Sequence, residues 1–276
     1  MSLIEKAVNR MGGAENAAPA LQGSPLPQED TAAASLIERA AEVQPAAAVE
    51  RKKPTSSATT AGRQISIDLE RLASLGFLAP DAERSQIAEE FRVVKRPLIT
   101  NVQAGDALEK HRNLIMVTSS MPGEGKSFCA LNLALSIAME RDITVMLVDA
   151  DVAKPSVLNN LGLRAEAGLM DLLLDRSLQV GDVLLKTNIE KFSILPAGRR
   201  HKHATELLAS DGMARLLNEI ATRYPDRIVI FDSPPLLVTS EARELAAHMG
   251  QIVMVVEAGR TSQDAVNEAL SYLQVC

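Results

Sequence analysis

From residue 113 onwards, short apolar runs alternate with longer amphipathic stretches along the chain. The runs are rich in Val and Ile and cover residues 113–120, 143–151, 192–198, 227–235 and 251–259. Amphipathic or Ala/Leu-rich stretches lie at 126–140, 204–223, 240–248 and 262–273. Strands that are apolar on both faces and alternate with helices are typical of a parallel sheet covered on both sides. The pattern therefore predicts an α/β fold with a doubly wound, mostly parallel sheet.

The first 62 residues lack this alternation. Apolar positions at helical spacing occur near the start, but residues 11–62 consist mainly of Ala, Pro, Gln, Glu, Ser and Thr. This composition predicts a largely disordered tether over residues 1–62, with at most a transient helix at 31–43, and a folded domain over residues 63–276. Apolar residues on one face further predict a helix from about Asp81 to Arg96, ended by Pro97.

The chain stops at Cys276, directly after the last predicted helix. A further strand would normally close the alternation at this point. We therefore expect either a sheet that is short by one edge strand or a polypeptide that lacks its natural end.

Composition narrows the class of protein. The chain has 276 residues and a net charge of -6, which gives no global cationic field, so nucleic acid is not an expected partner. Two cysteines, Cys129 and Cys276, are too few for a disulfide framework or a zinc site, as expected in a reducing cytosol. No apolar run approaches the roughly 18 residues of a membrane span. We therefore expect a cytoplasmic protein that contacts a membrane only through a partner.

The motif S-S-M-P-G-E-G-K-S at residues 119–127 lies between a predicted strand and a predicted helix. This context favours a phosphate-binding loop, although Ser120 replaces the usual first glycine. Gly123 and Gly125 let backbone N–H groups approach phosphate oxygens, and the helix adds the positive end of its dipole. Lys126 would bridge the β and γ phosphates of ATP, and Ser127 would bind Mg²⁺. The alternative is a turn that binds nothing. The predicted nucleotide contacts are Ser120, Pro122, Gly123, Glu124, Gly125, Lys126, Ser127 and Phe128.

Three aspartates follow later strands. Asp149 and Asp151 are separated by one residue at the end of the second apolar run, and Asp232 follows four apolar residues in the fourth. The carboxyl ends of parallel strands share one sheet edge, where ligands bind in open α/β folds. Ser127, Asp149 and Asp232 are therefore the predicted Mg²⁺ ligands, and Lys126, Asp149 and Asp151 the predicted catalytic residues, with one aspartate accepting a proton from an attacking hydroxyl. A solvated turn ending in Pro155 is the alternative.

Three segments together resemble the bacterial tyrosine kinases that accompany exopolysaccharide synthesis, and most closely the autokinases of exosortase-associated loci. They are P-G-E-G-K-S at 122–127, D-A-D-V-A-K-P at 149–155 and F-D-S-P-P at 231–235. The resemblance covers residues 65–276 and 2–10. It implies a P-loop NTPase fold of the partitioning-ATPase type, in a branch whose loop commonly lacks the first glycine. Partitioning and cell-division ATPases carry a further lysine where this chain has Met121.

The resemblance also implies partners. A helix with the motif E-x-x-R-x-x-R joins subunits into a ring in the family, and here Glu89, Arg92 and Lys95 occupy these places. Lysine keeps the charge but loses the bidentate fork, and a solvated helix face is the alternative. Activation would come from a membrane-spanning regulator of polysaccharide chain length, which would recruit the chain to the inner membrane face. The substrates would be protein tyrosines.

The chain departs from the family pattern in its tyrosines. Such kinases carry a C-terminal tyrosine cluster, whereas this chain has only Tyr224 and Tyr272, which packing also explains. An arginine common after the second aspartate is replaced by Ala153 followed by Lys154. The main hypothesis is an ATP-dependent protein-tyrosine (auto)kinase that regulates polysaccharide synthesis, chain length or export. The alternative is a nucleotide-switched ATPase scaffold of the partitioning type that transfers no phosphate.

Overall fold

The computed structural model describes residues 63–80, 85–104, 111–224 and 226–274, all of which belong to one compact unit, Ser57–Cys276. The predicted tether at residues 1–62 lies outside the described residues. The described elements are, in chain order, β1 (Arg63–Ile65), α2 (Leu69–Ser74), α3 (Gln86–Gln103), β2 (Leu114–Ser119), α4 (Lys126–Ala138), β3 (Thr144–Asp149), α5 (Val157–Leu161), α6 (Leu169–Leu174), α7 (Val180–Val183), β4 (Leu185–Thr187), β5 (Phe192–Leu195), α8 (Ala204–Leu208), α9 (Asp211–Arg223), β6 (Arg227–Asp232), α10 (Ser240–Ala246), β7 (Gln251–Val255) and α11 (Gln263–Leu273).

Within the described residues, seven strands form one sheet in the order β1-β4-β5-β3-β6-β2-β7. Every neighbouring pair is parallel except β4 and β5, which run antiparallel with Leu185 opposite Ile194. The predicted α/β fold with a mostly parallel sheet is confirmed. The five predicted apolar runs became β2, β3, β5, β6 and β7, and the parallel register places the ends of β2, β3 and β6 at one edge.

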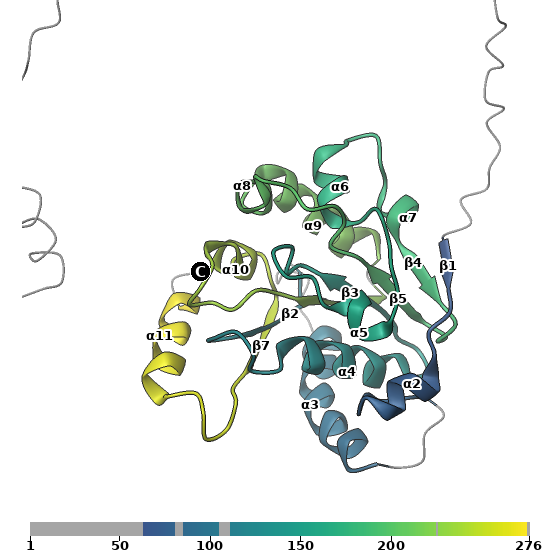
Figure 1. The fold of residues 1–276 in the computed structure, drawn as a ribbon, viewed down its shortest axis with the longest axis vertical. Coiled ribbons are helices and arrows are strands. Elements are labelled where there is room, and N and C mark those ends of the chain that lie inside the picture. Colours follow the sequence, from purple (N-terminus) through teal and green to yellow (C-terminus); the bar gives the residue numbers. More distant parts are fainter. Residues whose placement is uncertain (1–62, 81–84, 105–110, 225, 275–276) are drawn as a thin grey trace, which may run out of the picture. The chain divides into compact units, whose positions relative to one another are not determined.

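Helices cover both faces of the sheet (Figure 1). Leu114 and Met116 of β2 contribute to one apolar core with residues of α6 to α11, whereas Ile115 and Val117 contribute to a second core with residues of α2 to α5. Each of these four side chains is fully buried. Successive residues of a strand point to opposite faces, so a strand between two helical layers must be apolar at every position.

The long helix α3 differs from its prediction. The Ser85 side chain accepts a hydrogen bond from the Ala88 N–H and caps the helix, which begins at Gln86 rather than near Asp81. The helix then continues through Pro97 to Gln103. Proline removes one helical hydrogen bond, but the turns beyond it bury Ile99 in the core beneath α3. Tertiary packing therefore overrides the local stop signal.

The sequence pattern did not resolve the shorter helices and strands as separate elements. The predicted helix over 204–223 is two helices, because the Ser210 side chain caps α9 by accepting from the Met213 N–H. The remaining short elements, β1, β4 and α5 to α7, have six residues or fewer and carry little periodic signal. In the part of the chain that the structure describes, no helix has both the length and the apolar content to cross a membrane.

Candidate nucleotide-binding site

The loop between β2 and α4 has the backbone of a phosphate cradle. Gly123 and Gly125 have φ angles of 91° and 90°, in the left-handed region that other residues adopt only with strain. Gly125 is the N-cap of α4 and offers no side chain to the first N–H groups of that helix. These donors are therefore open to an anion, and the helix dipole favours one there.

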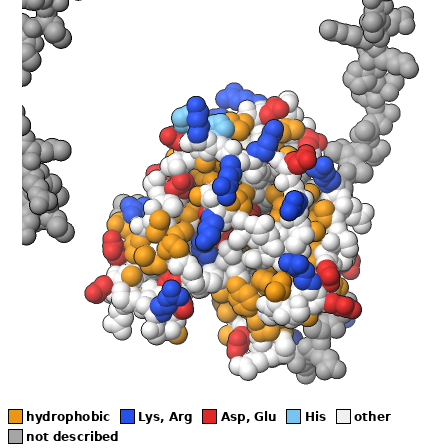
Figure 2. All heavy atoms as spheres, in the orientation of Figure 1, with side chains coloured by type: hydrophobic (Ala, Val, Ile, Leu, Met, Phe, Trp, Pro, Cys, Tyr) orange, Lys and Arg blue, Asp and Glu red, His pale blue; other side chains and the backbone are white. Residues whose placement is uncertain are grey.

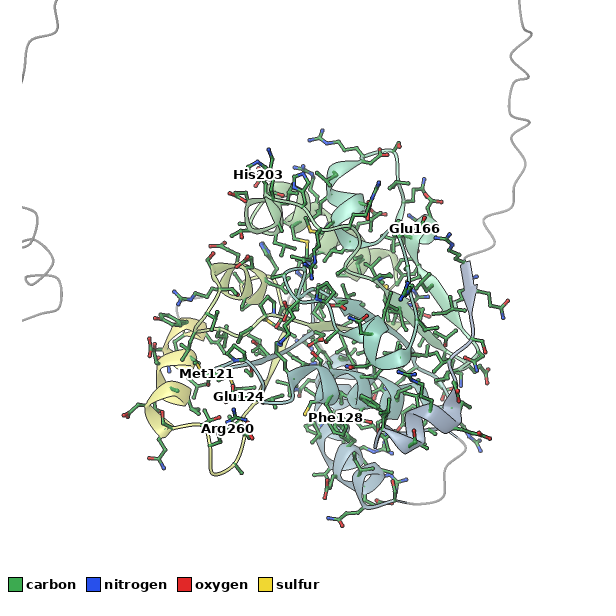
Figure 3. The ribbon with its side chains drawn as sticks, in the orientation of Figure 1. Met121, Glu124, Phe128, Glu166, His203 and Arg260 are labelled. Atoms are coloured by element: carbon green, nitrogen blue, oxygen red, sulfur yellow. The ribbon has the colours of Figure 1, made fainter. Side chains whose placement is uncertain are left out.

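Glu124 holds this loop from within. One of its carboxylate oxygens accepts the Met121 N–H at 2.6 Å, and the other accepts the hydroxyl of Thr261 in the loop after β7. The side chain is 8% exposed, and Figure 3 shows Glu124 beside Met121 at the start of the loop. Glu124 was predicted to contact the nucleotide, but its carboxylate is used within the protein, which leaves its backbone for that contact.

A pocket of about 390 Å³ opens in front of the loop. It is lined by Pro122, Gly123, Gly125, Lys126, Ser127, Phe128, Asp151, Ala153, Lys154, Ser156, Asn160, Pro234, Pro235, Val238 and Thr239. Of the predicted nucleotide contacts, Ser120 and Glu124 do not line it. Ser120 is fully buried and its hydroxyl has no hydrogen-bond partner, while the ring of Phe128 also contacts Phe77 at 5.1 Å between centroids.

The wall formed by residues 233–236 is fixed to β2. The Ser233 hydroxyl donates to the Val117 carbonyl at 2.9 Å, and the Thr118 hydroxyl donates to the Pro234 carbonyl at 2.9 Å. The Leu236 N–H donates to the Ser119 carbonyl. These bonds hold the two prolines opposite the phosphate loop. The S-P-P motif was noticed in the sequence, but its contribution to the pocket wall was not predicted. Ser156, Asn160 and Val238 carried no sequence signal.

Lys126 is paired with Asp151. Its ammonium group lies 3.1 Å from a carboxylate oxygen of Asp151, and both side chains are largely buried. The other Asp151 oxygen accepts the Lys154 N–H at 3.0 Å, which fixes the turn after β3. The predicted cation and one predicted acid of the site therefore meet directly.

Asp149 and Asp232 face each other on neighbouring strands, where they are register partners of β3 and β6. One oxygen of Asp149 accepts the N–H groups of Ser156 and Val157, both at 3.1 Å. Asp232 accepts a hydrogen bond of 3.5 Å from the Ser156 hydroxyl, and the nearby Ser127 hydroxyl lowers its pKa. The second oxygen of each aspartate is buried without a hydrogen-bond partner. The two predicted metal ligands thus lie together with unused oxygens.

Burial sets the protonation of this pair. Loss of solvent, followed by repulsion from Asp232, raises the pKa of Asp149 to about 7. Burial also raises the pKa of Asp232 to about 6, although the Ser127 hydroxyl and the Lys126 charge oppose the rise. Two buried carboxylates on directly paired residues of neighbouring strands favour a proton or a cation between them.

These residues fit a magnesium ion. Two orphaned carboxylate oxygens and the Ser127 hydroxyl form an oxygen-only donor set, which is the type that Mg²⁺ prefers. Among the described residues, no group of three or more His, Cys, Asp or Glu side chains is placed to hold a metal by itself. The remaining ligands would come from phosphate oxygens and water, as is usual for Mg²⁺ in nucleotide sites.

The three predicted ring residues on α3 do not share one surface. Glu89 and Arg92 are exposed and form an ion pair of 2.9 Å. Lys95 is only 5% exposed, donates to the Ser136 carbonyl at 2.6 Å and pairs with Glu140 at 2.9 Å. Its charge therefore anchors α3 to the end of α4, and the expectation that Lys95 faces a neighbouring subunit is wrong for this structure.

The two tyrosines both make contacts within the protein. Arg227 stacks over the ring of Tyr224 at 4.5 Å, directly after α9. The Tyr272 hydroxyl donates to Glu268 at 3.1 Å, and Arg243 lies 3.4 Å from the centre of its ring. These contacts support the packing interpretation of both residues.

Comparison with known proteins places the site in context. The ParA family, described as NUBPL iron-transfer P-loop NTPase, matches residues 110–184. Tyrosine-protein kinase YwqD of Bacillus subtilis is 31% identical over 199 residues, which are 72% of this chain and 80% of that protein. Succinoglycan biosynthesis transport protein ExoP of Rhizobium meliloti is 30% identical over 200 residues, but the chain spans only 24% of its length.

Solved structures with a similar fold include kinase domains. The chimerical protein CapA2B2 superposes with a TM-score of 0.60 and 27% identity, covering 76% of this chain and 87% of that chain. The VpsO kinase domain gives a TM-score of 0.55 and 28% identity, covering 69% and 93%. The kinase domain of Escherichia coli tyrosine kinase ETK, at 24% identity and a TM-score of 0.61, shares the fold. With its phosphate loop, its strand-end acids and a relative of such coverage, the chain belongs to the family of bacterial tyrosine-protein kinases.

Proposed function

We propose that this chain transfers the γ-phosphoryl group of ATP to tyrosine hydroxyls of proteins through the residues described above. The observation that carries the proposal is the convergence of three features at one sheet edge. They are the open phosphate cradle with Lys126, the buried pair Asp149 and Asp232, and the Lys126–Asp151 ion pair. The kinase relatives support the same reaction.

The residues of the loop would bind the triphosphate. The backbone N–H groups of residues 123–127 would donate hydrogen bonds to phosphate oxygens, and the ammonium of Lys126 would move from Asp151 to the β and γ phosphates. Pro234, Pro235 and Phe128 would form the apolar walls of the pocket. The contacts of Lys154 with the phosphates would replace those of the arginine that is common in the family.

Ser127, Asp149 and Asp232 would hold Mg²⁺, which when bound would neutralise charge on the phosphate oxygens. Asp149 would also orient the acceptor hydroxyl. Asp151, released from Lys126, would take the proton of that hydroxyl during transfer.

The biological role follows from the relatives. One of them is named for succinoglycan biosynthesis and transport. We propose that this kinase regulates exopolysaccharide synthesis, chain length or export, in the cytoplasm and at the inner membrane face, where a membrane-spanning chain-length regulator would activate it. If copies assemble into a ring, the exposed Glu89 and Arg92 are the α3 residues available for the contact.

The test is phosphotyrosine formation. The full chain is incubated with Mg-ATP, alone and with tyrosine-containing peptides, and phosphotyrosine is mapped by mass spectrometry. Lys126→Met should abolish the signal, whereas Lys186→Met, at an exposed lysine of β4 outside the pocket, should leave it unchanged. Phosphate release or ATP-dependent assembly without any Lys126-dependent phosphotyrosine would instead identify the nucleotide-switched scaffold.

A further inference from the structure

A second pocket adjoins the proposed nucleotide site at the loop after β3. Its volume is about 430 Å³, and Asp149 and Pro155 line it on this side. The same segment serves both pockets, because Asn159 lines the second pocket and its neighbour Asn160 lines the first. Apart from Asp149, none of the residues that line this second pocket has a role in the binding proposed for the nucleotide and Mg²⁺.

The walls of the second pocket suit an aromatic ring. Leu158 and Leu163 form one side, and Pro196 and Ala197, directly after β5, form the other. Asp149 is 1% exposed, so its carboxylate lies at the inner end of the pocket, and one of its oxygens has no hydrogen-bond partner. A buried acceptor without a donor favours a ligand that brings a hydroxyl to it. An aromatic ring with a hydroxyl at its tip meets both conditions.

The mouth of this pocket is cationic. Arg164 lines the pocket and is exposed, and the exposed Arg200 and Lys202 follow the lining residue Gly198. The only acid in the loop that joins α5 to α6, Glu166, does not line the pocket. Figure 2 shows Lys and Arg side chains across the middle of the face in view, whereas Asp and Glu lie mostly towards its margin.

The basic loop is held in place rather than loose. Asp171, which is 3% exposed, accepts the Gly168 N–H, the Arg199 N–H and the Arg199 guanidinium at 2.6 Å. Gly198 has a φ of 84°, and a side chain there would meet the Asp171 carboxylate at 2.5 Å. Arg200 and Lys202 therefore follow a residue whose position beside the pocket is fixed by hydrogen bonds.

We propose that this second pocket receives the acceptor tyrosine, and that Arg164 selects tyrosines with acidic neighbours. The inference rests on the proposed kinase function. In the transfer, the phenolic oxygen forms a bond to the γ-phosphorus, the bond from that phosphorus to the β,γ-bridging oxygen breaks, and ADP leaves with the electron pair. The phenolic proton passes to Asp151, which the phosphates have released from Lys126.

Peptide binding tests the inference without phosphoryl transfer. The full chain, with Mg²⁺ and a non-hydrolysable ATP analogue, is titrated with labelled peptides in which one tyrosine is flanked by Glu, Ala or Lys. The Glu-flanked peptide should bind most tightly. Arg164→Glu should weaken it by about fivefold, the upper range for an exposed ion pair. Arg164→Lys should keep the preference, and Arg176→Glu, the same change at an exposed arginine outside the pocket, should have no effect.

A second variant tests the pocket itself. Asn159→Trp, at an exposed lining position, should crowd the pocket and weaken all three peptides while the affinity for the nucleotide analogue stays unchanged. Equal binding of the three peptides by the unaltered protein, or unchanged binding by both Arg164→Glu and Asn159→Trp, would overturn the inference. Loss of kinase activity in the phosphotyrosine assay is a separate result, because the titration does not depend on catalysis.

Discussion

The ammonium group of Lys126 lies 3.1 Å from a carboxylate oxygen of Asp151, with both side chains shielded from solvent. The pair satisfies two buried charges that would otherwise be costly. It also means that phosphates must compete with a carboxylate for the lysine. The aspartate therefore opposes nucleotide binding in the absence of a cation, whatever it contributes later in the reaction.

Replacing Asp151 should accordingly tighten metal-free binding. We expect Asp151→Asn to lower the Kd for ATP without Mg²⁺ by about tenfold, which corresponds to about 1.4 kcal/mol. Removal of the negative charge both frees Lys126 and reduces repulsion of the phosphates. Titration in EDTA measures the effect, with Asp142→Asn as an exposed control. Weaker metal-free binding by Asp151→Asn would show that the pair organises the cradle rather than competing with ATP.

The carboxyl pair Asp149 and Asp232 should make stability depend on pH. Their pKa values rise from the usual 3.8 to about 7 and about 6, so the folded protein retains protons that the unfolded chain has lost. The unfolding free energy contributed by the pair must therefore fall as pH rises from about 4 to 7. The lowered pKa of Glu140 acts in the opposite direction and at lower pH, since its contribution is lost as pH falls.

Urea denaturation in EDTA at pH 5 and pH 8 isolates this effect. Asp232→Asn removes one charge of the pair and should raise the unfolding free energy at pH 8 by on the order of 1–3 kcal/mol, with a smaller gain at pH 5. Mg²⁺ with nucleotide should stabilise the unaltered protein more than the variant. An Asp232→Asn protein that is no more stable at pH 8 would contradict the unfavourable burial of these two charges.

Glu124 should control the shape of the phosphate loop. Its carboxylate bridges the Met121 N–H and the Thr261 hydroxyl, and so links the loop to the segment after β7. Removing a charged hydrogen-bond acceptor costs about 1.5–3 kcal/mol, so Glu124→Ala should raise the Kd for Mg-ATP by roughly tenfold to a hundredfold. Thr261→Val should act in the same direction but less strongly.

The control for Glu124 is Glu257→Ala. Glu257 precedes Thr261 in the same segment, but its carboxylate pairs only with the exposed Arg260 in the described structure. This variant should bind Mg-ATP as the unaltered protein does. Equal losses in the Glu124 and Glu257 variants would mean that the segment, rather than the bridge, supports the loop.

The sequence predicted the sheet edge better than the side chains on it. Strands β2, β3 and β6 each contain four consecutive apolar residues, so their existence, and hence the meeting of Asp149 with Asp232, followed from the pattern. The pairing of Lys126 with Asp151 did not, because it depends on the turn after β3. The inward direction of Glu124 likewise depends on Thr261, which is 137 residues away in the chain.

Helix α3 shows the same limit at the level of secondary structure. Local rules end a helix before Pro97, and only the burial of Ile99 against the second core explains why it continues. The sequence also predicted one exposed helix face for Arg92 and Lys95, because the two residues are three positions apart and nothing in the sequence distinguishes their exposure. Lys95 is in fact buried, where it contacts the carbonyl of Ser136 in the last turn of α4 and the carboxylate of Glu140 just after that helix.

Lys95 should therefore matter for stability more than its neighbour Arg92. Lys95→Met leaves the Ser136 carbonyl without its partner and Glu140 without its main cation, so the unfolding free energy should fall by about 1–3 kcal/mol. Arg92→Met removes only an exposed pair and should change it by less than about 0.5 kcal/mol. Because the Lys95 hydrogen bond lowers the pKa of Glu140, the difference between the variants should shrink as acid protonates Glu140. Urea denaturation at pH 7 and pH 3.5 measures both quantities. Equal stability of the two variants would return Lys95 to the set of residues available for contact with a neighbouring subunit.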